Sequence, residues 1–283
     1  MFPTPIDKTS PPVQWLYKAV LPLALIVWLA PIIAVALTSI RGQGDLTAGN
    51  YWGIPTQWRI AENYTAVFTN TPILHYIGNS FLVTIPTVIG AVALSCLAGF
   101  ALGIYRFKLN LLVFFIFVGG NFVPFQILMV PVRELSLKLG LYDTVTGLVL
   151  FHVAFQTGFC TFFMRNFIRE LPSELIDAAR VEGATEFQIF WRVVLPLVRP
   201  AIAALAVLIF TFIWNDYFWA TVLIQGDHAM PVTGGLKTLN GQWVAQWQLV
   251  SAGSIVAALP PVLIFFLMQK HFIAGLTMGA TKG

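Results

Sequence analysis

The residue types that carry out most enzyme chemistry are scarce in this chain of 283 residues, and they form no catalytic pattern. No GxxxxGKS/T phosphate-binding loop occurs, because the two glycines before Lys237-Thr238 stand too close to that pair. HExxH, GxSxG and CxxC motifs are also missing, and no predicted span holds two carboxylates. Of the four histidines only His152 lies well inside a helix, where we expect packing or pore lining. The sequence therefore predicts a chain that is not an enzyme and holds no metal or cofactor.

Asp216 is the one acidic residue that interrupts an otherwise apolar predicted span. It follows Pro200 by about 16 residues, or ~24 Å along a helix, which puts it near the outer interface. Proton-coupled transporters carry ionisable groups deep in the membrane, so a single shallow carboxylate argues weakly for a proton relay. We therefore expect Asp216 to serve structure or an outer gate. A stand-alone secondary transporter or channel remains the alternative function.

The densest set of charged and helix-capping residues follows the fourth predicted span. Pro172-Ser173 signals a helix start, with acidic residues in the first turn where they suit the helix dipole. Gly183 can take the left-handed conformation that ends this helix. Thr185 and Gln188 have the spacing of a capping box, which predicts a second helix. We expect Leu195-Pro196 to break that helix before the next span. The segment is thus predicted to form two helices joined by a glycine turn, an arrangement suited to docking into a partner protein.

Composition places these residues in a membrane protein. Apolar side chains make up 58% of the chain and charged ones 10%, whereas soluble domains carry about 25% charged residues. The mean hydropathy is +0.80. Secreted enzymes, nucleic-acid-binding proteins and disulfide scaffolds are excluded, and Cys96 and Cys160 stand in apolar runs as small hydrophobic residues. The fold class predicted is an all-α membrane protein.

Six predominantly apolar stretches have the ~20-residue length that a membrane helix needs. They occupy residues 18–41, 76–105, 108–133, 143–165, 200–223 and 250–268. Gly119, Gly120 and Pro124 predict a kink or weakened helix in the third span. The second span carries small residues at every fourth position, which allows close helix packing within the chain or against a partner subunit. These small residues are Ala91, Ser95, Gly99 and Gly103.

The Lys and Arg residues set the predicted orientation. An even number of spans puts both termini on one side, and the loops on that side hold 11 Lys and Arg against five on the other. The positive-inside rule then predicts both termini in the cytoplasm. The predicted regions are a cytoplasmic tail (1–14), a first transmembrane helix (15–40), an outer loop (41–73) with one helical pattern at 60–68, a five-helix core (74–272) and a cytoplasmic C-terminal tail (273–283).

At residues 171–196 the chain resembles a known family. The pattern resembles the EAA loop of binding-protein-dependent ABC importer permeases. It begins with Asp177-Ala178-Ala179, continues after three residues with Gly183 and after nine more with Val193, and ends after one more with Leu195-Pro196. Asp177 stands where Glu is usual and Val193 where Ile is usual. Asn79-Ser80, Trp214-Asn215-Asp216 and the C-terminal nine residues resemble the carbohydrate branch, the maltose-permease type.

The resemblance implies a type I importer fold and a permease subunit in the cytoplasmic (inner) membrane, surrounded by lipid. It implies as partners a second homologous permease, two cytoplasmic ATPase subunits that bind the ATP and magnesium, and an outer, periplasmic solute-binding protein; no nucleic acid is implied. The EAA helix would dock on the ATPase through Glu174, Asp177, Ala178, Ala179, Glu182, Gly183, Leu195 and Pro196. The tail residues expected near the ATPase are Gly279, Lys282 and Gly283.

The solute implied by the resemblance is a sugar, with a polyol, glycoside or glycerol phosphate as alternatives. Polar groups inside spans are costly in lipid, so they should face a cavity or a neighbouring helix, and aromatic rings can stack on a sugar. The pathway candidates chosen on this basis are Asn121, Phe122, Gln126, Gln156, Trp214, Asn215, Asp216 and Trp219. Hydrogen bonds between packed helices explain these polar residues equally well.

Overall fold

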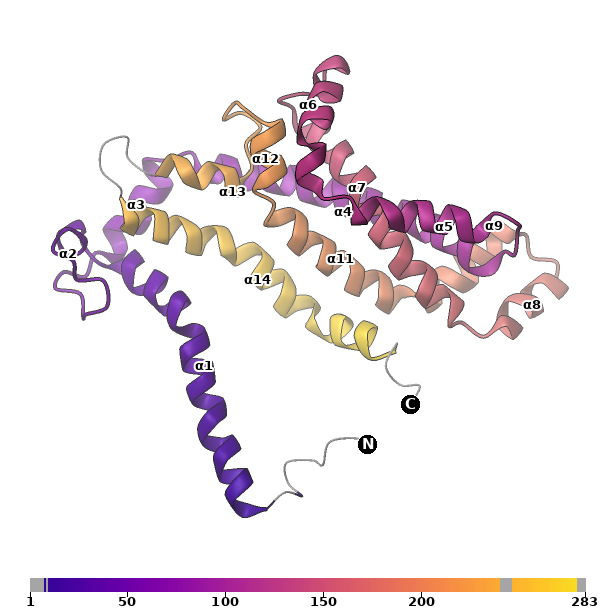
Figure 1. Ribbon diagram of the computed structural model, residues 1–283, viewed down its shortest axis with the longest axis horizontal. Coiled ribbons are helices and arrows are strands. Elements are labelled where there is room, and N and C mark those ends of the chain that lie inside the picture. The colour runs from indigo at the N-terminus through magenta and orange to yellow at the C-terminus, as the bar shows by residue number, and fades with distance from the viewer. Residues whose placement is uncertain (1–7, 9, 240–245, 279–283) are drawn as a thin grey trace. The chain divides into compact units, whose positions relative to one another are not determined.

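The computed structural model describes residue 8 and residues 10–239 and 246–278, and all regular structure in these residues is helical (Figure 1). This confirms the predicted all-α fold class. An isolated bridge between Arg41 and Trp58 is the one β-type pairing among the described residues. The longer helices are α1 (Pro11–Ile40), α3 (Ile60–Thr69), α4 (Ile73–Ile104), α5 (Asn110–Gly119), α6 (Met129–Lys138), α7 (Val145–Arg169), α8 (Ser173–Val181), α11 (Arg199–Trp214) and α14 (Trp247–Met278).

Short helical pieces connect the longer ones. They are α2 (Gln43–Thr47), η2 (Gly120–Phe122), η3 (Phe125–Leu128), α9 (Glu186–Ile189), the π-helical turn η4 (Phe190–Val194), α10 (Leu195–Leu197), α12 (Phe218–Leu223), α13 (Val232–Gly235) and η5 (Leu236–Leu239). Helix α3 confirms the helical pattern expected at residues 60–68, and α2 was not expected.

Four of the described helices are long and apolar enough to cross a membrane. They are α1, α4, α7 and the Trp247–Gln269 part of α14. Two bent helix pairs also qualify, and six spans result if each pair is counted as one. The pairs are Asn110–Phe122 with Phe125–Lys138, bent by 88°, and Glu186–Leu197 with Arg199–Trp214, bent by 73°.

The chain divides into two compact units, which are described separately. Unit 1 comprises residues 1–71 and 238–256, and unit 2 comprises residues 72–237 and 257–283. In unit 1, the loop after α1 is organised by Arg41, whose side chain is fully buried and donates hydrogen bonds to the carbonyl oxygens of Leu37, Asn50 and Gly53. Asn63 of α3 donates to the carbonyl oxygens of Ser39 and Arg41 at 2.9 and 3.0 Å. The loop is therefore a hydrogen-bonded structure and not a loose connection.

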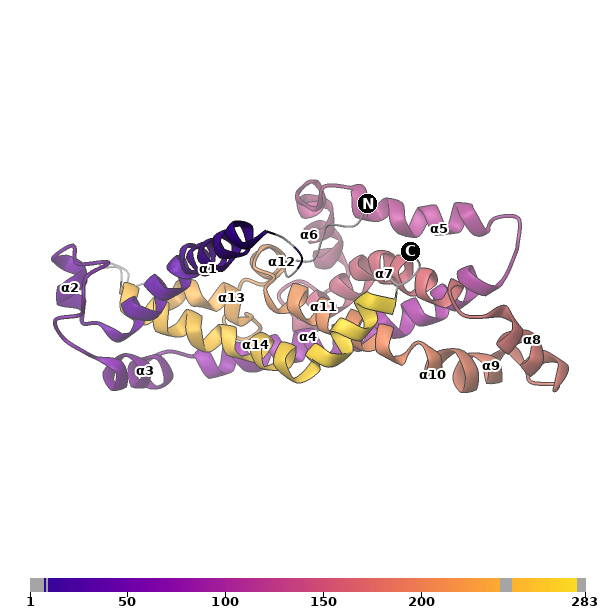
Figure 2. The same cartoon turned by 90° about the horizontal axis from the view of Figure 1, so that it is seen from below.

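In unit 2, α4 and α7 lie side by side along most of their length (Figure 2). The stripe of small residues on α4 makes this possible. A Cβ atom on Gly99 would lie 2.9 Å from the backbone nitrogen of Arg165, and Ser95 Oγ donates to the carbonyl oxygen of Thr157 at 3.3 Å. The stripe therefore packs two helices of the same chain, which is the first of the two roles that its spacing predicted.

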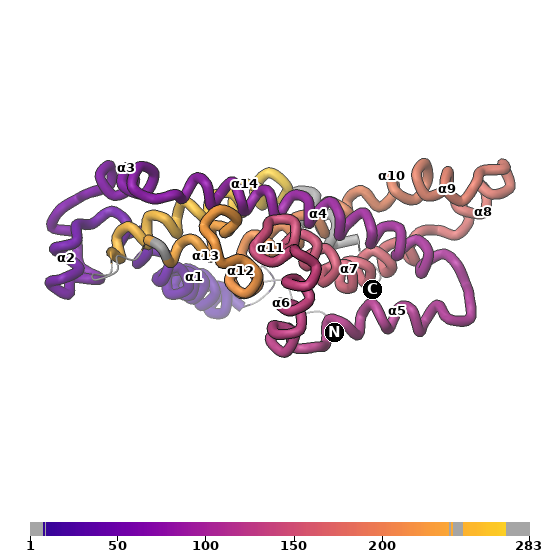
Figure 3. Tube along the Cα trace, turned by 90° about the horizontal axis from the view of Figure 1, so that it is seen from above, coloured from indigo at the N-terminus to yellow at the C-terminus, as the bar shows by residue number. Residues whose placement is uncertain are grey.

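The third predicted span bends at the residues expected to weaken it. Its two halves, α5 with η2 and η3 with α6, run nearly at right angles (Figure 3). The break falls at Val123-Pro124, where both residues have extended ψ angles of 122° and 116°. A proline disfavours the helical conformation of the residue before it, so Pro124 explains the position of the break. The predicted kink is confirmed, and it is sharper than the sequence indicated.

The fifth predicted span, residues 200–223, is not one continuous helix. Helix α11 ends at Trp214, and α12 begins at Phe218 after a break at residues 215–217. A second correction concerns Leu195-Pro196, which we expected to end the preceding helix. The helical run instead continues through Leu197 and bends at Val198. Pro200 lies in the first turn of α11, where its missing N–H costs nothing.

Candidate functional site

The helix-turn-helix segment lies at one end of unit 2 (Figures 1 and 3). Helix α8 ends in a Schellman motif, since Ala184 N–H donates to Ala179 O and Gly183 N–H donates to Arg180 O, both at 3.0 Å. Gly183 has a φ of +81°, which confirms the left-handed conformation expected of it. Thr185 and Gln188 form the reciprocal hydrogen bonds of a capping box, as predicted. The turn between the two helices is thus fixed on both sides by local hydrogen bonds.

Arg180 ties α8 to α9. Its guanidinium contacts Glu186 at 2.9 Å and Asp177 at 3.3 Å. Glu186 also accepts a hydrogen bond of 2.6 Å from the hydroxyl of Tyr105, at the end of α4. Burial and the adjacent Glu186 carboxylate raise the pKa of Tyr105 to about 12, so its hydroxyl stays protonated and donates. These exposed ion pairs contribute little stability individually, and of the two only Arg180–Glu186 links α8 to α9.

The turn has one buried face and one exposed face. Ile176 and Ile189 are buried against the rest of unit 2. Val181 and Phe187 are 89% and 70% exposed, although both are apolar, and Trp191 is also exposed. We call Val181, Phe187 and Trp191 the apolar tip. Large apolar side chains gathered at a helix turn mark a surface that another protein can cover.

A π-helical turn, η4, connects α9 to α10, which contains Pro196. Leu195 N–H donates to Phe190 O, five residues earlier, so the helix is one residue wider there. In a regular α-helix the ring of Pro196 would clash with the carbonyl of Arg192 and leave it without a donor. The wider turn relieves this conflict, which explains why the helix does not end where we expected. Leu195 and Pro196 consequently lie inside the helix that leads to the Val198 bend.

The predicted coupling residues are grouped on this segment. Glu174 lies in the first turn of α8, Asp177 pairs with Arg180, and Glu182 caps the helix before Gly183. Ala178 is exposed and Ala179 is half-buried. The structure brings these residues together on α8 and its turn, with Leu195 and Pro196 farther along the chain. The tail candidates Gly279, Lys282 and Gly283 lie outside the described residues.

The other end of unit 2 holds a network that joins α4 to the segment before α13. Asn79 donates to the carbonyl oxygens of His228 and Met230 at 3.1 Å each, and Ser80 Oγ accepts from Val232 N–H at 2.8 Å. Tyr76 donates to Asp227 at 3.0 Å. Asn79-Ser80 was noted in the sequence only as part of a resemblance, and its structural role is to hold this segment against α4.

Asp143 holds the segment after α12 in place, a structural role that was not expected from the sequence. Its carboxylate accepts hydrogen bonds of 2.8 Å from the backbone N–H groups of Gln225 and Gly226. Burial opposes the charged form, but these two donors outweigh it and lower the pKa of Asp143. Asp143 also has a φ of +60°, which is rare for a residue other than glycine. The one sequence signal for it is a lone Asp before a span, which is too common to be specific.

Asp216 organises the break between α11 and α12. Its carboxylate accepts from the backbone N–H groups of Trp219 and Ala220 at 3.2 and 2.9 Å, so it caps α12. His152 of α7 is buried, and its Nε2 lies 3.4 Å from Asp216 Oδ2 without a hydrogen bond to it. Asp216 therefore already has a structural role in this conformation, which agrees with the expectation from its depth.

The remaining pathway candidates fall into two groups. Trp214 and Trp219 are buried, and Trp214 Nε1 donates to Ala257 O at 2.9 Å, so neither ring can stack on a solute in this conformation. Exposed candidates surround the bend between α5 and α6 and the α11–α12 break; they are Asn121, Phe122, Gln126 and Asn215. Gln156 is half-buried on α7. Asn121 also lines a mostly apolar cavity of about 540 Å³ between α4, α5 and α7.

Comparison with a family model matches residues 82–277 to the family described as "Binding-protein-dependent transport system inner membrane component". The match contains α8, the Gly183 turn and the whole of the network around Asp216.

Two curated proteins resemble the chain over nearly its whole length. A probable ABC transporter permease protein of Pyrococcus horikoshii is 34% identical over 253 residues, 89% of this chain and 91% of that protein. The arabinooligosaccharides transport system permease protein AraQ of Halalkalibacterium halodurans is 33% identical over 279 residues, 98% of this chain and 99% of that protein.

A solved structure has the same fold. A chain from the crystal structure of a bacterial ABC transporter involved in the import of the acidic polysaccharide alginate superposes with a TM-score of 0.80 at 23% identity. The superposition covers 96% of this chain and 99% of the other.

Proposed function

This chain belongs to the inner membrane components of binding-protein-dependent transport systems, and we propose that it moves a sugar or oligosaccharide into the cell. It is the permease subunit of an ABC importer, a multi-pass protein of the inner membrane, and its transporter complex includes a periplasmic binding protein. It is not itself the ATPase. The sugar assignment is supported by the arabinooligosaccharide permease, which this chain matches from end to end.

The complex that we propose has two homologous permease subunits, of which this chain is one, and two cytoplasmic ATPase subunits. We propose for the chain the regions that the sequence predicted: a cytoplasmic N-terminal tail, a first span, an outer loop, a core of five spans and a cytoplasmic C-terminal tail. The tail would approach the ATPase dimer.

The observation that carries the coupling proposal is the exposed apolar tip on a rigid turn. Burying Val181, Phe187 and Trp191 in a cleft of an ATPase subunit would remove apolar surface from water at about 25 cal/mol per Å². The Schellman motif and capping box would keep α8 and α9 from separating while the ATPase moves. Through η4 and α10, that motion would reach the bend at Val198 and then α11.

For the solute pathway, we propose the exposed polar and aromatic residues beside the two helix breaks. Asn121, Phe122 and Gln126 flank the Val123-Pro124 break, and Asn215 lies in the break after α11. Helix breaks free backbone carbonyls and N–H groups that can bind hydroxyl groups, and such breaks are tolerated at membrane depth where they line a cavity. Gln156 is a weaker candidate because it is half-buried.

Uptake should be driven by ATP and should not depend on Asp216 as a proton carrier. We expect Asp216→Asn to leave uptake insensitive to proton uncouplers while ATP is maintained, because Asp216 caps α12 and an amide oxygen can accept one of its two hydrogen bonds. The measurement is uptake of a panel of labelled sugars, polyols and glycerol phosphate in cells expressing the whole importer. Uptake that follows the proton gradient at constant ATP would favour the secondary transporter instead.

The proposed orientation has both termini in the cytoplasm. Cysteines introduced at Thr47 and Gly241 should react with a membrane-impermeant maleimide in intact cells, and a cysteine at Gly183 should react only after permeabilisation. Cys96 and Cys160 are buried, so the natural thiols should give a low background. Labelling of Gly183→Cys in intact cells would reverse the proposed topology.

A further inference from the structure

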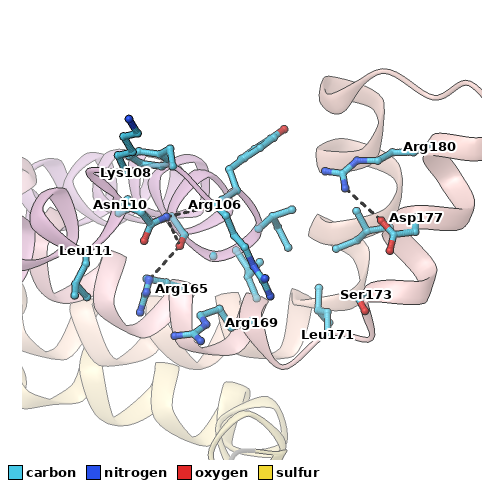
Figure 4. Close-up of a pocket in the computed structure, with 17 residues that line it drawn as sticks. Arg106, Lys108, Asn110, Leu111, Arg165, Arg169, Leu171, Ser173, Asp177 and Arg180 are labelled. Carbon is cyan, nitrogen blue, oxygen red and sulfur yellow. Dashed lines mark hydrogen bonds and ion pairs between the residues drawn. The ribbon is translucent and has the colours of Figure 1, made fainter.

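A cavity of about 720 Å³ lies where the α4–α5 connection, the end of α7 and α8 meet. Five basic side chains line this cavity: Arg106, Lys108, Arg165, Arg169 and Arg180. Among the described residues, Asp177 is the one acidic residue in the lining. In Figure 4, Arg165, Arg169 and Arg106 extend into the same space, and Arg180 and Asp177 face them from α8. The cavity therefore concentrates positive charge at the end of a membrane-spanning bundle.

Arg165 is the side chain that most needs an anionic partner. It is 8% exposed, and its Nε donates to the carbonyl oxygen of Leu102 at 3.2 Å. Its guanidinium lies 4.0 Å from the ring centroid of Phe114, which compensates part of its charge. No ion pair of the described residues includes Arg165, Arg169 or Arg106. Buried charges are normally paired because desolvation without a counter-charge is costly.

The cavity cannot supply that counter-charge from its own acidic residue. Asp177 lies 3.3 Å from Arg180, and Arg180 also binds Glu186. Both carboxylates are thus engaged on the α8 side of the cavity. Among the described residues the buried Arg165 is thus left without a carboxylate partner, and the exposed Arg106 and Arg169 add two further positive charges beside it.

The surroundings of the cavity indicate what kind of anion would fit. Next to Arg106, the α4–α5 connection and the first turn of α5 expose Phe107, Leu109, Leu111 and Leu112, each 45–58% exposed. A free anion would gain nothing from these side chains, whereas the acyl chains of a lipid could cover them. Basic pockets between membrane helices on the cytoplasmic side suit the headgroups of anionic lipids.

We propose that this cavity binds the phosphate group of an anionic phospholipid, with Arg165, Arg169 and Arg106 around the phosphate and the acyl chains along α5. The inference rests on the proposed topology, in which this end of unit 2 lies on the cytoplasmic side of the membrane, and it does not depend on the docking role of α8. Its failure would leave the proposed function untouched.

The test measures binding of dioctanoyl phosphatidylglycerol to the purified importer complex by native mass spectrometry, with dioctanoyl phosphatidylcholine as the neutral comparison. Wild type should bind the anionic lipid preferentially. Arg106→Gln combined with Arg169→Gln should weaken binding about 30-fold, because each basic residue near the surface contributes about 1 kcal/mol and 1.4 kcal/mol is tenfold. Both side chains are exposed, so the double variant should fold even if Arg165→Gln does not.

The matched control is Arg192→Gln combined with Arg199→Gln, which removes two exposed charges that do not line the cavity. It should change lipid binding by less than about threefold, since only distant surface charge is lost. Equal binding to wild type and the cavity variant would overturn the proposal, as would equal binding of the two lipids. Displacement of the anionic lipid by inorganic phosphate at a similar concentration would show a free-phosphate site and overturn the lipid assignment.

Discussion

Gly183→Val is expected to abolish transport while the protein still reaches the membrane. Gly183 has a φ of +81°, and a β-branched residue in this conformation costs on the order of 1–2 kcal/mol. A Cβ atom there would meet no atom within 4 Å in the isolated chain, so the fold should survive. The added volume would instead project from the turn into the proposed ATPase cleft. Uptake and binding-protein-stimulated ATP hydrolysis in proteoliposomes should both fall to background.

The chain offers a close control for backbone strain. Gly49 also has a positive φ, of +78°, is also exposed, and also has open space around its Cβ position. Gly49→Val should therefore impose the same local strain without affecting coupling. Gly183→Asn should retain partial activity, because asparagine tolerates the left-handed conformation. If Gly183→Val keeps the ATPase bound with full stimulated hydrolysis, this turn is not the coupling element.

Arg41→Ala should have the largest effect on stability. The Arg41 side chain is 0% exposed and serves three carbonyl groups in the loop that follows α1. Removing it would leave these acceptors without their donors, at about 1–3 kcal/mol for each that stays buried. We expect a free energy loss of about 3 kcal/mol or more, seen as a lower thermal midpoint of the detergent-solubilised protein and a lower level in the membrane.

Arg59→Ala provides the comparison in the same loop. Arg59 pairs with Glu62 in an exposed i,i+3 ion pair, which contributes about 0–1 kcal/mol. Its loss should leave the thermal midpoint nearly unchanged. Equal effects of Arg41→Ala and Arg59→Ala would mean that the buried hydrogen bonds of Arg41 do not stabilise this loop.

Local signals in the sequence predicted local structure well. The Gly183 turn, the Thr185–Gln188 capping box and the weak point near Pro124 each depend on the conformational limits of a few residues, and all three are present. The small-residue stripe of α4 predicted close packing but not its partner. Choosing between α7 and a second subunit requires the tertiary arrangement, which no spacing within α4 contains.

Two predicted helix ends were wrong, one at Leu195-Pro196 and one at residue 223. Pro196 normally ends a helix, but the π-helical turn before it absorbs the conflict, and nothing in the residue pattern signals a wider turn. The span expected to continue to residue 223 ends at Trp214 because Asp216 caps a new helix. We expected a structural or gating role for Asp216 from its depth, but not that it would cap a helix after a break.

Hydrogen bonds between residues far apart in the chain could also not be predicted from the sequence. Asp143 accepts from Gln225 and Gly226, more than 80 residues later in the chain. Tyr76 and Asn79 bind a segment about 150 residues later. Such pairs depend on which ends of which helices meet, so polar residues at span ends could be flagged but not matched.

The most direct test of the central claim is cross-linking from the apolar tip. Val181 is 89% exposed, whereas the natural thiols of Cys96 and Cys160 are buried, so Val181→Cys supplies one reactive thiol. Attaching a maleimide–benzophenone reagent to this thiol in the assembled importer and then illuminating it should join this chain to an ATPase subunit by insertion into a neighbouring C–H bond, and Thr47→Cys in the proposed outer loop should not do so. A Val181→Cys protein that supports transport but gives no adduct with the ATPase, or an adduct formed equally from Thr47→Cys, would contradict the docking of this turn on the ATPase.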